Sequence, residues 1–284
     1  MPYNYAHALV GICSVNRCSI NVAGLIDRCS DAFFIGTMGP DPYFGDALPR
    51  SLAHPCQSHL SNLLHSLDGR ILFSALLDLA KESEIYSAYA LGFVCHFVLD
   101  NHTHPYIEAY FPGRKHTPAE IAMDLYLVDR ANEPRLYVPP NVFYETASLR
   151  QLDALHAALF ERLFLLDTRG AFARAFRKWI RINALTFDPS GSKQKLLRFF
   201  PAAARYLVGR HEDAADALNL EHAPWAAPWA PDEIRTESFL DLFDEACAAS
   251  SLLVNLAATA MESGDFSAVL SAIGRRSADA APII

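Results

Sequence analysis

Apolar residues recur at every third or fourth position in several long segments, which is the pattern of amphipathic helices. The alternation typical of half-buried strands is scarce, and turn-rich pieces containing Pro, Gly and Asp separate the helical segments. The pattern therefore predicts an all-α, multi-helix bundle. Its helices are expected at residues 16–31, 56–82, 84–101, 117–131, 149–167, 170–185, 192–209, 236–263 and 265–276.

Composition and charge narrow the class of protein. A net charge of −8 argues against coating nucleic acid through overall positive charge, so no stable nucleic-acid complex is expected. No uncharged apolar run reaches the length of a membrane span, and the first residues lack the basic and apolar pattern of a secretion signal. The six cysteines form no CxxC pair and are expected to be reduced. These features predict a cytoplasmic protein.

Histidine is concentrated in the first part of the chain, where seven of the eleven lie between residues 54 and 116. In GFVCHFVLDNHTHPYI (residues 92–107), His96 and Asp100 are four residues apart and would share one helix face. His102 and His104 follow, where Pro105 is expected to end the helix. Imidazole and carboxylate at this spacing can hold one metal ion. The alternative is a buried histidine bonded to a helix-mate aspartate.

A second set, His116, Glu120 and Asp124, again steps by four residues. Its alternative explanation is a helix start, with Thr117 as N-cap, Pro118 at the first helical position and Glu120 completing a capping box. If Glu120 only caps the helix, Asp124 is the reserve carboxylate.

Upstream residues extend the candidate set. Asp41 lies between two prolines in GPDPYFGD, a stiff loop that can hold its carboxylate toward a site. His7 lies near the start of the chain, and one of His54, His59 and His65 is expected to be a ligand. The full set is His7, Asp41, His65, His96, Asp100, His104, His116 and Glu120. Nitrogen and oxygen donors without thiolate suit catalytic zinc, and clustered divalent ions are typical of phosphoester hydrolysis.

The sequence resembles the zinc-dependent phospholipase C family, which shares its all-α fold with the zinc-dependent single-strand nucleases. The matching segments, in the family's order, are MPYNYAHALVG, FFIGTMGPDPYF, the LLH of residues 63–65, YALGFVCHFVLDNHTHPYI and HTPAEIAMD. The rest of the chain matches only in being helical. The resemblance implies a helical bundle with a cluster of two to three zinc ions in a central cleft.

Carried over by residue, the resemblance implies a first zinc site at His65, His96 and Asp100. Asp41 would lie beside it as a ligand, or as the base that orients the attacking water. His65 is the preferred central histidine, because the amphipathic segment after it resembles the family best. The order of preference is His65, His59, His54.

The other two sites also follow from the resemblance. The second would be held by His104, His116 and Glu120. The third would be held by His7 and a bridging Asp100, together with the N-terminal amine, which belongs to Pro2 if Met1 is removed. His104 follows Asp100 more closely than in the secreted enzymes, which leaves His102 as an alternative.

The chain is expected to form one domain over residues 1–284, with a metal-binding part at 1–137 and a helical part at 142–284. YVPPN (137–141) is the best place to divide it, yet such a joint also occurs inside single domains.

A basic segment stands out in this acidic protein. Residues 170–210 carry nine basic side chains against one acidic residue, Asp188, interleaved with aromatic residues. Such a pattern is most often a solvated helix pair whose aromatic residues face the core. The alternative is a surface that makes transient contact with a membrane through residues 174–210. Trp225 and Trp229 are predicted to form a packed, proline-rich connection.

Together these features predict a zinc-dependent phosphoesterase that hydrolyses a phosphodiester or a phosphomonoester, with Asp41 as the catalytic residue. Its substrate is expected to be a small phosphorylated compound or a phospholipid. The alternative is a non-catalytic protein of the same fold that zinc only stabilises.

Overall fold

A computed structural model describes residues 4–46, 57–130, 147–188, 190–197, 199–200, 207–208, 217–278 and 280. These residues form helices and connecting turns without any strand, which confirms the all-α prediction. The helices are α1 (Asn4–Val15), α2 (Ile20–Arg28), α3 (Ser30–Thr37), η1 (Asp41–Asp46), α4 (His59–His65), α5 (Gly69–Ala80), α6 (Glu84–Tyr110), η2 (Gly113–Lys115), α7 (His116–Arg130), α8 (Leu149–Phe164), α9 (Ala171–Thr186), α10 (Ser192–Leu196), α12 (Phe239–Ser263) and α13 (Ser267–Ile273).

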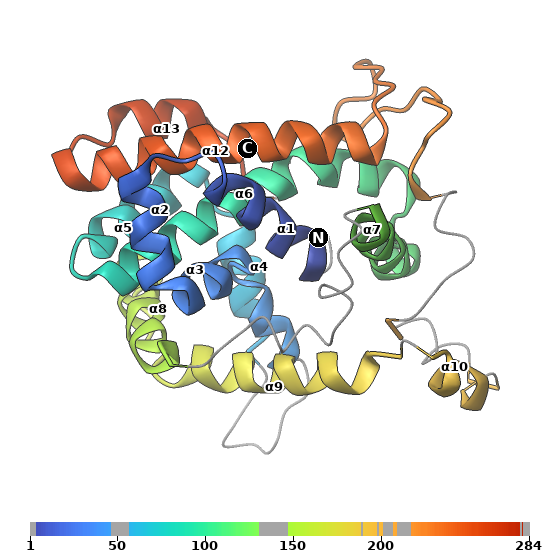
Figure 1. Cartoon of the computed structure of the whole chain (residues 1–284), viewed down its shortest axis with the longest axis horizontal. Coiled ribbons are helices and arrows are strands. Elements are labelled where there is room, and N and C mark those ends of the chain that lie inside the picture. The colour runs from blue at the N-terminus through green and yellow to red at the C-terminus, as the bar shows by residue number, and fades with distance from the viewer. Residues whose placement is uncertain are drawn as a thin grey trace.

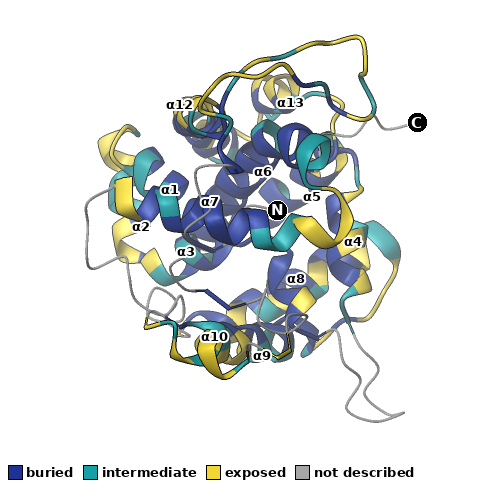
Figure 2. Ribbon diagram, turned by 90° about the vertical axis from the view of Figure 1, so that its right-hand side faces the viewer, coloured by how far each residue is buried: buried dark blue, intermediate teal, exposed yellow. Residues whose placement is uncertain are grey.

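The longest helix, α6, lies at the centre of the molecule (Figure 1). It packs against α3 and α12, and it also contacts α1, α5, α7 and α8. Its residues 88–100 are all buried, and Figure 2 shows the exposed positions at the outside of the surrounding helices. The central helix therefore carries the predicted site residues His96 and Asp100 into the interior.

Two glycines let α3 and α6 touch backbone to backbone. A Cβ on Gly92 would lie 2.1 Å from the carbonyl oxygen of Phe33, and one on Gly36 would lie 2.2 Å from that of Tyr89. No side chain fits at either position without moving a helix. Because His96 follows Gly92 by one turn, this contact sets how closely His96 approaches α3 and the loop after it.

Several helix boundaries differ from the predicted ones. The expected helix at 16–31 is divided at Cys29 into α2 and α3, and the one at 56–82 is divided into α4 and α5. The second break is local, because the side chain of Asp68 accepts a hydrogen bond from the backbone of Arg70 and caps α5. Helix α1 was not predicted. It is buried on nearly all sides, and such a helix lacks the polar face that reveals an amphipathic one.

The prediction that Pro105 ends the central helix is wrong, because α6 continues to Tyr110. Proline in a helix interior costs about 3 kcal/mol, since it lacks the N–H and crowds the preceding turn. Tyr106 and Ile107, just beyond it, are only 1% and 0% exposed. Burying two such side chains contributes roughly 1.5 to 3 kcal/mol each and offsets that cost.

The helix expected at 192–209 is also too long. Helix α10 ends at Leu196, residues 199–200 and 207–208 are not helical, and the rest of this stretch lies outside the described residues. The chain here instead makes a single bridge between Phe187 and Val208. Residues 137–141, the predicted joint, lie outside the described residues as well.

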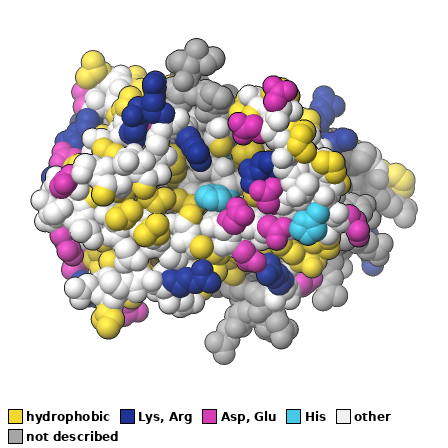
Figure 3. Space-filling model, turned by 90° about the horizontal axis from the view of Figure 1, so that it is seen from above, with side chains coloured by type: hydrophobic (Ala, Val, Ile, Leu, Met, Phe, Trp, Pro, Cys, Tyr) yellow, Lys and Arg dark blue, Asp and Glu magenta, His cyan; other side chains and the backbone are white. Residues whose placement is uncertain are grey.

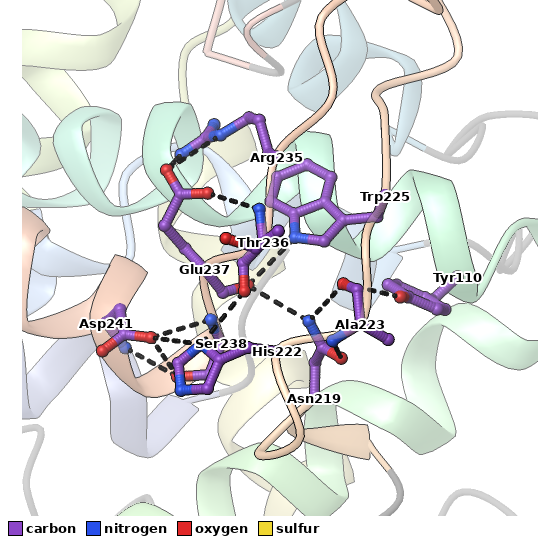
Figure 4. Close-up of polar contacts among 10 residues, drawn as sticks. All are labelled: Tyr110, Asn219, His222, Ala223, Trp225, Arg235, Thr236, Glu237, Ser238 and Asp241. Atoms are coloured by element: carbon purple, nitrogen blue, oxygen red, sulfur yellow. Dashed lines mark hydrogen bonds and ion pairs between the residues drawn. The ribbon is translucent and has the colours of Figure 1, made fainter.

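The segment before α12 forms the packed connection that was predicted (Figure 4). Trp225 is buried, meets Tyr106 edge-on, and donates a hydrogen bond of 2.9 Å from its indole nitrogen to the carbonyl of Glu237. The guanidinium of Arg235 lies 4.7 Å from the centre of the Trp225 ring. Trp229 is half-buried. Trp225 is therefore part of the packing that holds this connection on α6.

Within the described residues, no helix has both the length and the apolar character needed to cross a bilayer. Five cysteines, at positions 13, 18, 29, 95 and 247, are free thiols as expected, and Cys56 lies outside the described residues.

Candidate metal centre

Helix α6 supplies the first pair of site residues. His96 and Asp100 lie one turn apart, both are 0% exposed, and Nε2 of His96 is 3.2 Å from Oδ2 of Asp100. The four-residue spacing therefore places imidazole and carboxylate together, as the sequence predicted.

Three other elements bring the remaining members of a five-residue cluster to this pair. His7 comes from α1, Asp41 from the start of η1 and His65 from the end of α4. Nε2 of His7 lies 3.6 Å from Oδ1 of Asp100, whereas Nε2 of His65 lies 3.8 Å from its Oδ2. Oδ1 of Asp41 is 3.2 Å from Nε2 of His65. The two oxygens of Asp100 thus face different imidazoles, as a bridging ligand requires.

The loop that carries Asp41 approaches α6 through a glycine. Gly39 has φ +48°, and a Cβ there would lie 2.4 Å from the imidazole of His96. A side chain at this position would meet both backbone strain and a collision with His96. Glycine therefore lets the loop place Asp41 beside the cluster.

Hydrogen bonds orient the ring of His65. Its Nδ1 lies 2.9 Å from the carbonyl oxygen of Ser61, one turn earlier in the chain. Because a carbonyl only accepts, Nδ1 carries the hydrogen, and Nε2 keeps its lone pair for the cluster. Such a contact fixes both the tautomer and the plane of a ligand histidine.

A three-residue cluster forms where α6 and α7 meet. It consists of His104, His116 and Glu120, and Nε2 of His116 lies 2.8 Å from Oε1 of Glu120. Nδ1 of His116 lies 3.1 Å from Oε1 of Glu108. Glu108 was not among the predicted site residues, because it faces His116 only when α6 continues past Pro105. Glu108 holds the His116 ring so that Nε2 points to the cluster.

Burial controls the protonation of these groups. It lowers the pKa of His96 well below its usual range, and the neighbouring imidazoles of His7 and His65 lower it further. Burial also lowers the pKa of His104 well below its usual range. Both rings are therefore neutral, the form in which histidine binds metals. For Asp41, burial raises the pKa, and the contact with His65 opposes that rise.

The donors fit a zinc centre. Three trios place their ligand atoms within 4.8 Å of one another: His7, His96 and Asp100; Asp41, His65 and His96; His104, His116 and Glu120. Among the described residues, neither ring nitrogen of His96 makes a hydrogen bond, and the same holds for Oδ1 of Asp41. Leaving such buried atoms without a hydrogen bond costs about 1 to 3 kcal/mol each. Coordination by a metal would remove that cost.

The structure separates the alternative residues from the two clusters. His59 begins α4 and is exposed, whereas Nδ1 of His102 bonds the carbonyl of Val98 at 2.7 Å. Asp124 uses both carboxylate oxygens on backbone N–H groups at the start of α1. His54, Met1 and Pro2 lie outside the described residues.

The expected capping box at Glu120 placed the start of the helix at the wrong residue. Helix α7 begins at His116 rather than after Thr117, so Pro118 is the third helical residue. The carboxylate of Glu120 lies against the imidazole of His116, four residues before it.

Comparison with known proteins agrees with this donor set. The model of the family "Zinc dependent phospholipase C" matches residues 14–167, which is more than half of the chain. No curated protein and no solved structure matches the chain. The match contains every member of the two clusters except His7, which precedes it on α1. The chain therefore belongs to the zinc-dependent phospholipase C family.

Proposed function

We propose that this protein is a hydrolase of phosphoric esters, acting on a small phosphorylated compound or a phospholipid with about two to three bound zinc ions. The observation that supports this most is that the donor trios share ligands. His96 belongs to two of the three trios, and Asp100 faces three imidazoles. Ligands shared in this way hold ions close together, the arrangement that suits one phosphoryl group.

Asp41 is the residue we assign to the reacting water. Its side chain is 11% exposed, whereas those of His7, His65, His96 and Asp100 are 4% exposed or less. Of the five side chains, that of Asp41 therefore lies nearest to solvent. The carboxylate can accept a hydrogen bond from a water molecule there and turn the water's lone pair toward phosphorus.

Bound zinc would supply Lewis acidity, which acidifies water and draws negative charge from the phosphoryl oxygens. His7, His65, His96, Asp100 and Asp41 would hold the ions of one cluster, and His104, His116 and Glu120 would hold another. Most of these donors are buried, and the low dielectric around them strengthens their electrostatic contact with a phosphate.

The test loads the wild type and Asp41→Asn with zinc. It then compares their turnover of a chromogenic phosphodiester and of a chromogenic phosphomonoester. At saturating zinc we expect turnover to fall roughly 100-fold or more, because a positioned base typically contributes that much. Zinc affinity should fall as well, because Asp41 is also one of the donors of the five-residue cluster. Glu84→Gln, which removes an exposed partner of Arg28, is the control. If a zinc-loaded wild type hydrolyses neither ester nor phospholipid, the non-catalytic alternative holds instead.

We propose that the protein binds an anionic lipid surface, which would carry a phospholipid substrate. Arg174 and Lys178 pair with the buried Asp46, so this part of the basic segment is structural. The remaining surface combines exposed basic side chains with apolar ones that are 65–78% exposed. Its members are Arg177, Arg181, Lys195, Leu185, Leu196, Phe199 and Phe200. Such a combination is typical of interfacial binding.

The placement of α9 and α10 supports this surface. They lie on the side of the molecule opposite α12 and α13 in both ribbon views (Figures 1 and 2). On the face seen from above, which carries α12 and α13, basic side chains are scattered and acidic side chains lie on the same face (Figure 3).

We expect binding to vesicles of phosphatidylglycerol with phosphatidylcholine to be lost in Phe199→Ser/Phe200→Ser. Ile234→Ser, which removes an apolar residue that is 66% exposed elsewhere, should bind like the wild type. Equal binding by all three proteins would contradict this surface.

A further inference from the structure

A buried set of hydrogen-bonded polar side chains contacts the loop that carries Asp41, and none of its members belongs to either metal cluster. Tyr89 of α6, His156 of α8 and Tyr43 of η1 are each 1% exposed or less. Nε2 of His156 lies 2.6 Å from the hydroxyl of Tyr89, and Nδ1 lies 3.1 Å from the hydroxyl of Tyr43. The hydroxyl of Tyr89 also donates to the carbonyl oxygen of Gly39 at 3.3 Å.

The hydrogens in this chain can be assigned by elimination. The single hydroxyl hydrogen of Tyr89 goes to the Gly39 carbonyl, so Nε2–H of His156 donates to the Tyr89 oxygen. Nδ1 of His156 then carries the lone pair and accepts from Tyr43. Burial lowers the pKa of His156 to about 3, which agrees with the neutral ring that this assignment needs. The ring stacks on Phe172 with 3.7 Å between centres, which fixes its plane.

The two ends of this hydrogen-bonded set hold the loop on both sides of Asp41. Gly39 and Tyr43 are each two residues from Asp41, one before it and one after it. The first is held through its carbonyl and the second through its side chain. Because Gly39 also touches the His96 ring, a shift of this loop would change the position of Asp41 relative to the five-residue cluster.

We propose that His156, through Tyr43 and Tyr89, is a positioning residue that sets where the carboxylate of Asp41 lies. This inference rests on the proposed function in one respect, namely that Asp41 acts at a zinc-containing phosphoesterase site. A lone histidine far along the sequence gives no signal of such a role. Only the packing of α8 and η1 against α6 brings it within reach of the loop.

The test uses two variants that keep the ring volumes. His156→Phe removes both hydrogen bonds of the imidazole, and Tyr43→Phe removes only the link to η1. We expect each to weaken zinc affinity of the five-residue cluster and lower kcat, both by roughly 10- to 100-fold, as loss of an orienting contact does. KM should change little. The double variant should lose no more than His156→Phe alone, because both changes break the same link.

Tyr106→Phe separates positioning from stability. Tyr106, like Tyr89, is a buried tyrosine of α6. Its hydroxyl donates to the carbonyl of Ala217 at 2.8 Å and makes no contact with the loop of Asp41 in the described residues. This variant should lose similar stability but keep kcat and zinc affinity. The absorption spectrum of the Co²⁺-substituted protein gives a second readout. It should change in His156→Phe at the bands that Asp41→Asn also changes, and stay unchanged in Tyr106→Phe.

Two different failures can be told apart. If the wild type binds zinc and hydrolyses phosphoesters, yet His156→Phe behaves like Tyr106→Phe in kcat, zinc affinity and Co²⁺ spectrum, the positioning role is wrong. If the wild type itself takes up neither zinc nor Co²⁺, the proposed function fails first.

Discussion

Asp124 shows how a single buried carboxylate can place a ligand carried by another helix. Its oxygens accept hydrogen bonds from the backbone N–H groups of Tyr5 at 2.7 Å and Ala6 at 2.9 Å. These N–H groups belong to the first turn of α1, where they have no partner within the helix and the helix dipole attracts negative charge. Asp124 thereby ties α1 to α7, and His7 follows directly after this contact.

We expect Asp124→Asn to lower the free energy of unfolding by about 1 to 3 kcal/mol, because one buried N–H group loses its acceptor. Urea unfolding followed by circular dichroism measures the change. Asp265→Asn is the matched control, since Asp265 also accepts from a backbone N–H but is exposed at the start of α13. Equal losses in the two variants would show that burial of the Asp124 contact contributes nothing.

The buried His156 makes stability depend on pH. Its folded pKa of about 3 lies below the usual 6.5, so only the unfolded chain takes up this proton as the pH falls from 6.5 toward 3. Stability from this group is full above pH 6.5 and is lost below it. We expect the wild-type free energy of unfolding to fall more steeply between pH 6 and 4 than that of His156→Phe, by up to about 1.4 kcal/mol per pH unit. Parallel pH profiles would contradict a neutral buried imidazole, and His59→Gln, which changes an exposed histidine, is the control.

At the scale of elements, the contact of α3 with α6 depends on the absence of side chains at Gly36 and Gly92. Gly92→Ala would push a methyl group into the carbonyl of Phe33, and overpacking of this kind typically costs about 1 to 3 kcal/mol. We expect thermal unfolding to occur at a lower temperature in this variant. Gly24→Ala in α2 is the control, because its nearest neighbour would be the flexible side chain of Arg28 at 3.6 Å. Alanine should stabilise the helix at position 24 by up to about 1 kcal/mol. Stabilisation of Gly92→Ala as well would contradict the close packing of α3 on α6.

The sequence predicted the helices whose one face meets solvent, such as α7, α8, α9 and α12. It failed where tertiary contacts decide. Helix α1 is buried on nearly all sides and shows no amphipathic period, and α6 continues past Pro105 because the next residues are buried. Glu108 could not be recognised for the same reason, since its contact with His116 exists only in the longer helix.

At the scale of the whole molecule, the two clusters draw their donors from α1, η1, α4, α6 and α7. Pairs within one helix, His96 with Asp100 and His116 with Glu120, were predictable from their four-residue spacing. The preference for His65 over His59 came from the family resemblance and not from a local spacing. The packed fold places His65 beside Asp41 and leaves His59 exposed. His156 had no local pattern at all, because its partners lie on two other elements.

Because the donors meet only in the folded chain, zinc binding and folding should stabilise each other. The most direct measurement is the metal content of the purified, tag-free protein by elemental mass spectrometry. We compare the wild type with Asp100→Ala, and with Asp244→Ala as an exposed control. We predict about two to three zinc ions per chain, falling by more than one in Asp100→Ala and unchanged in the control. A content of one zinc or none, the same in wild type and Asp100→Ala, would contradict the bridged zinc cluster.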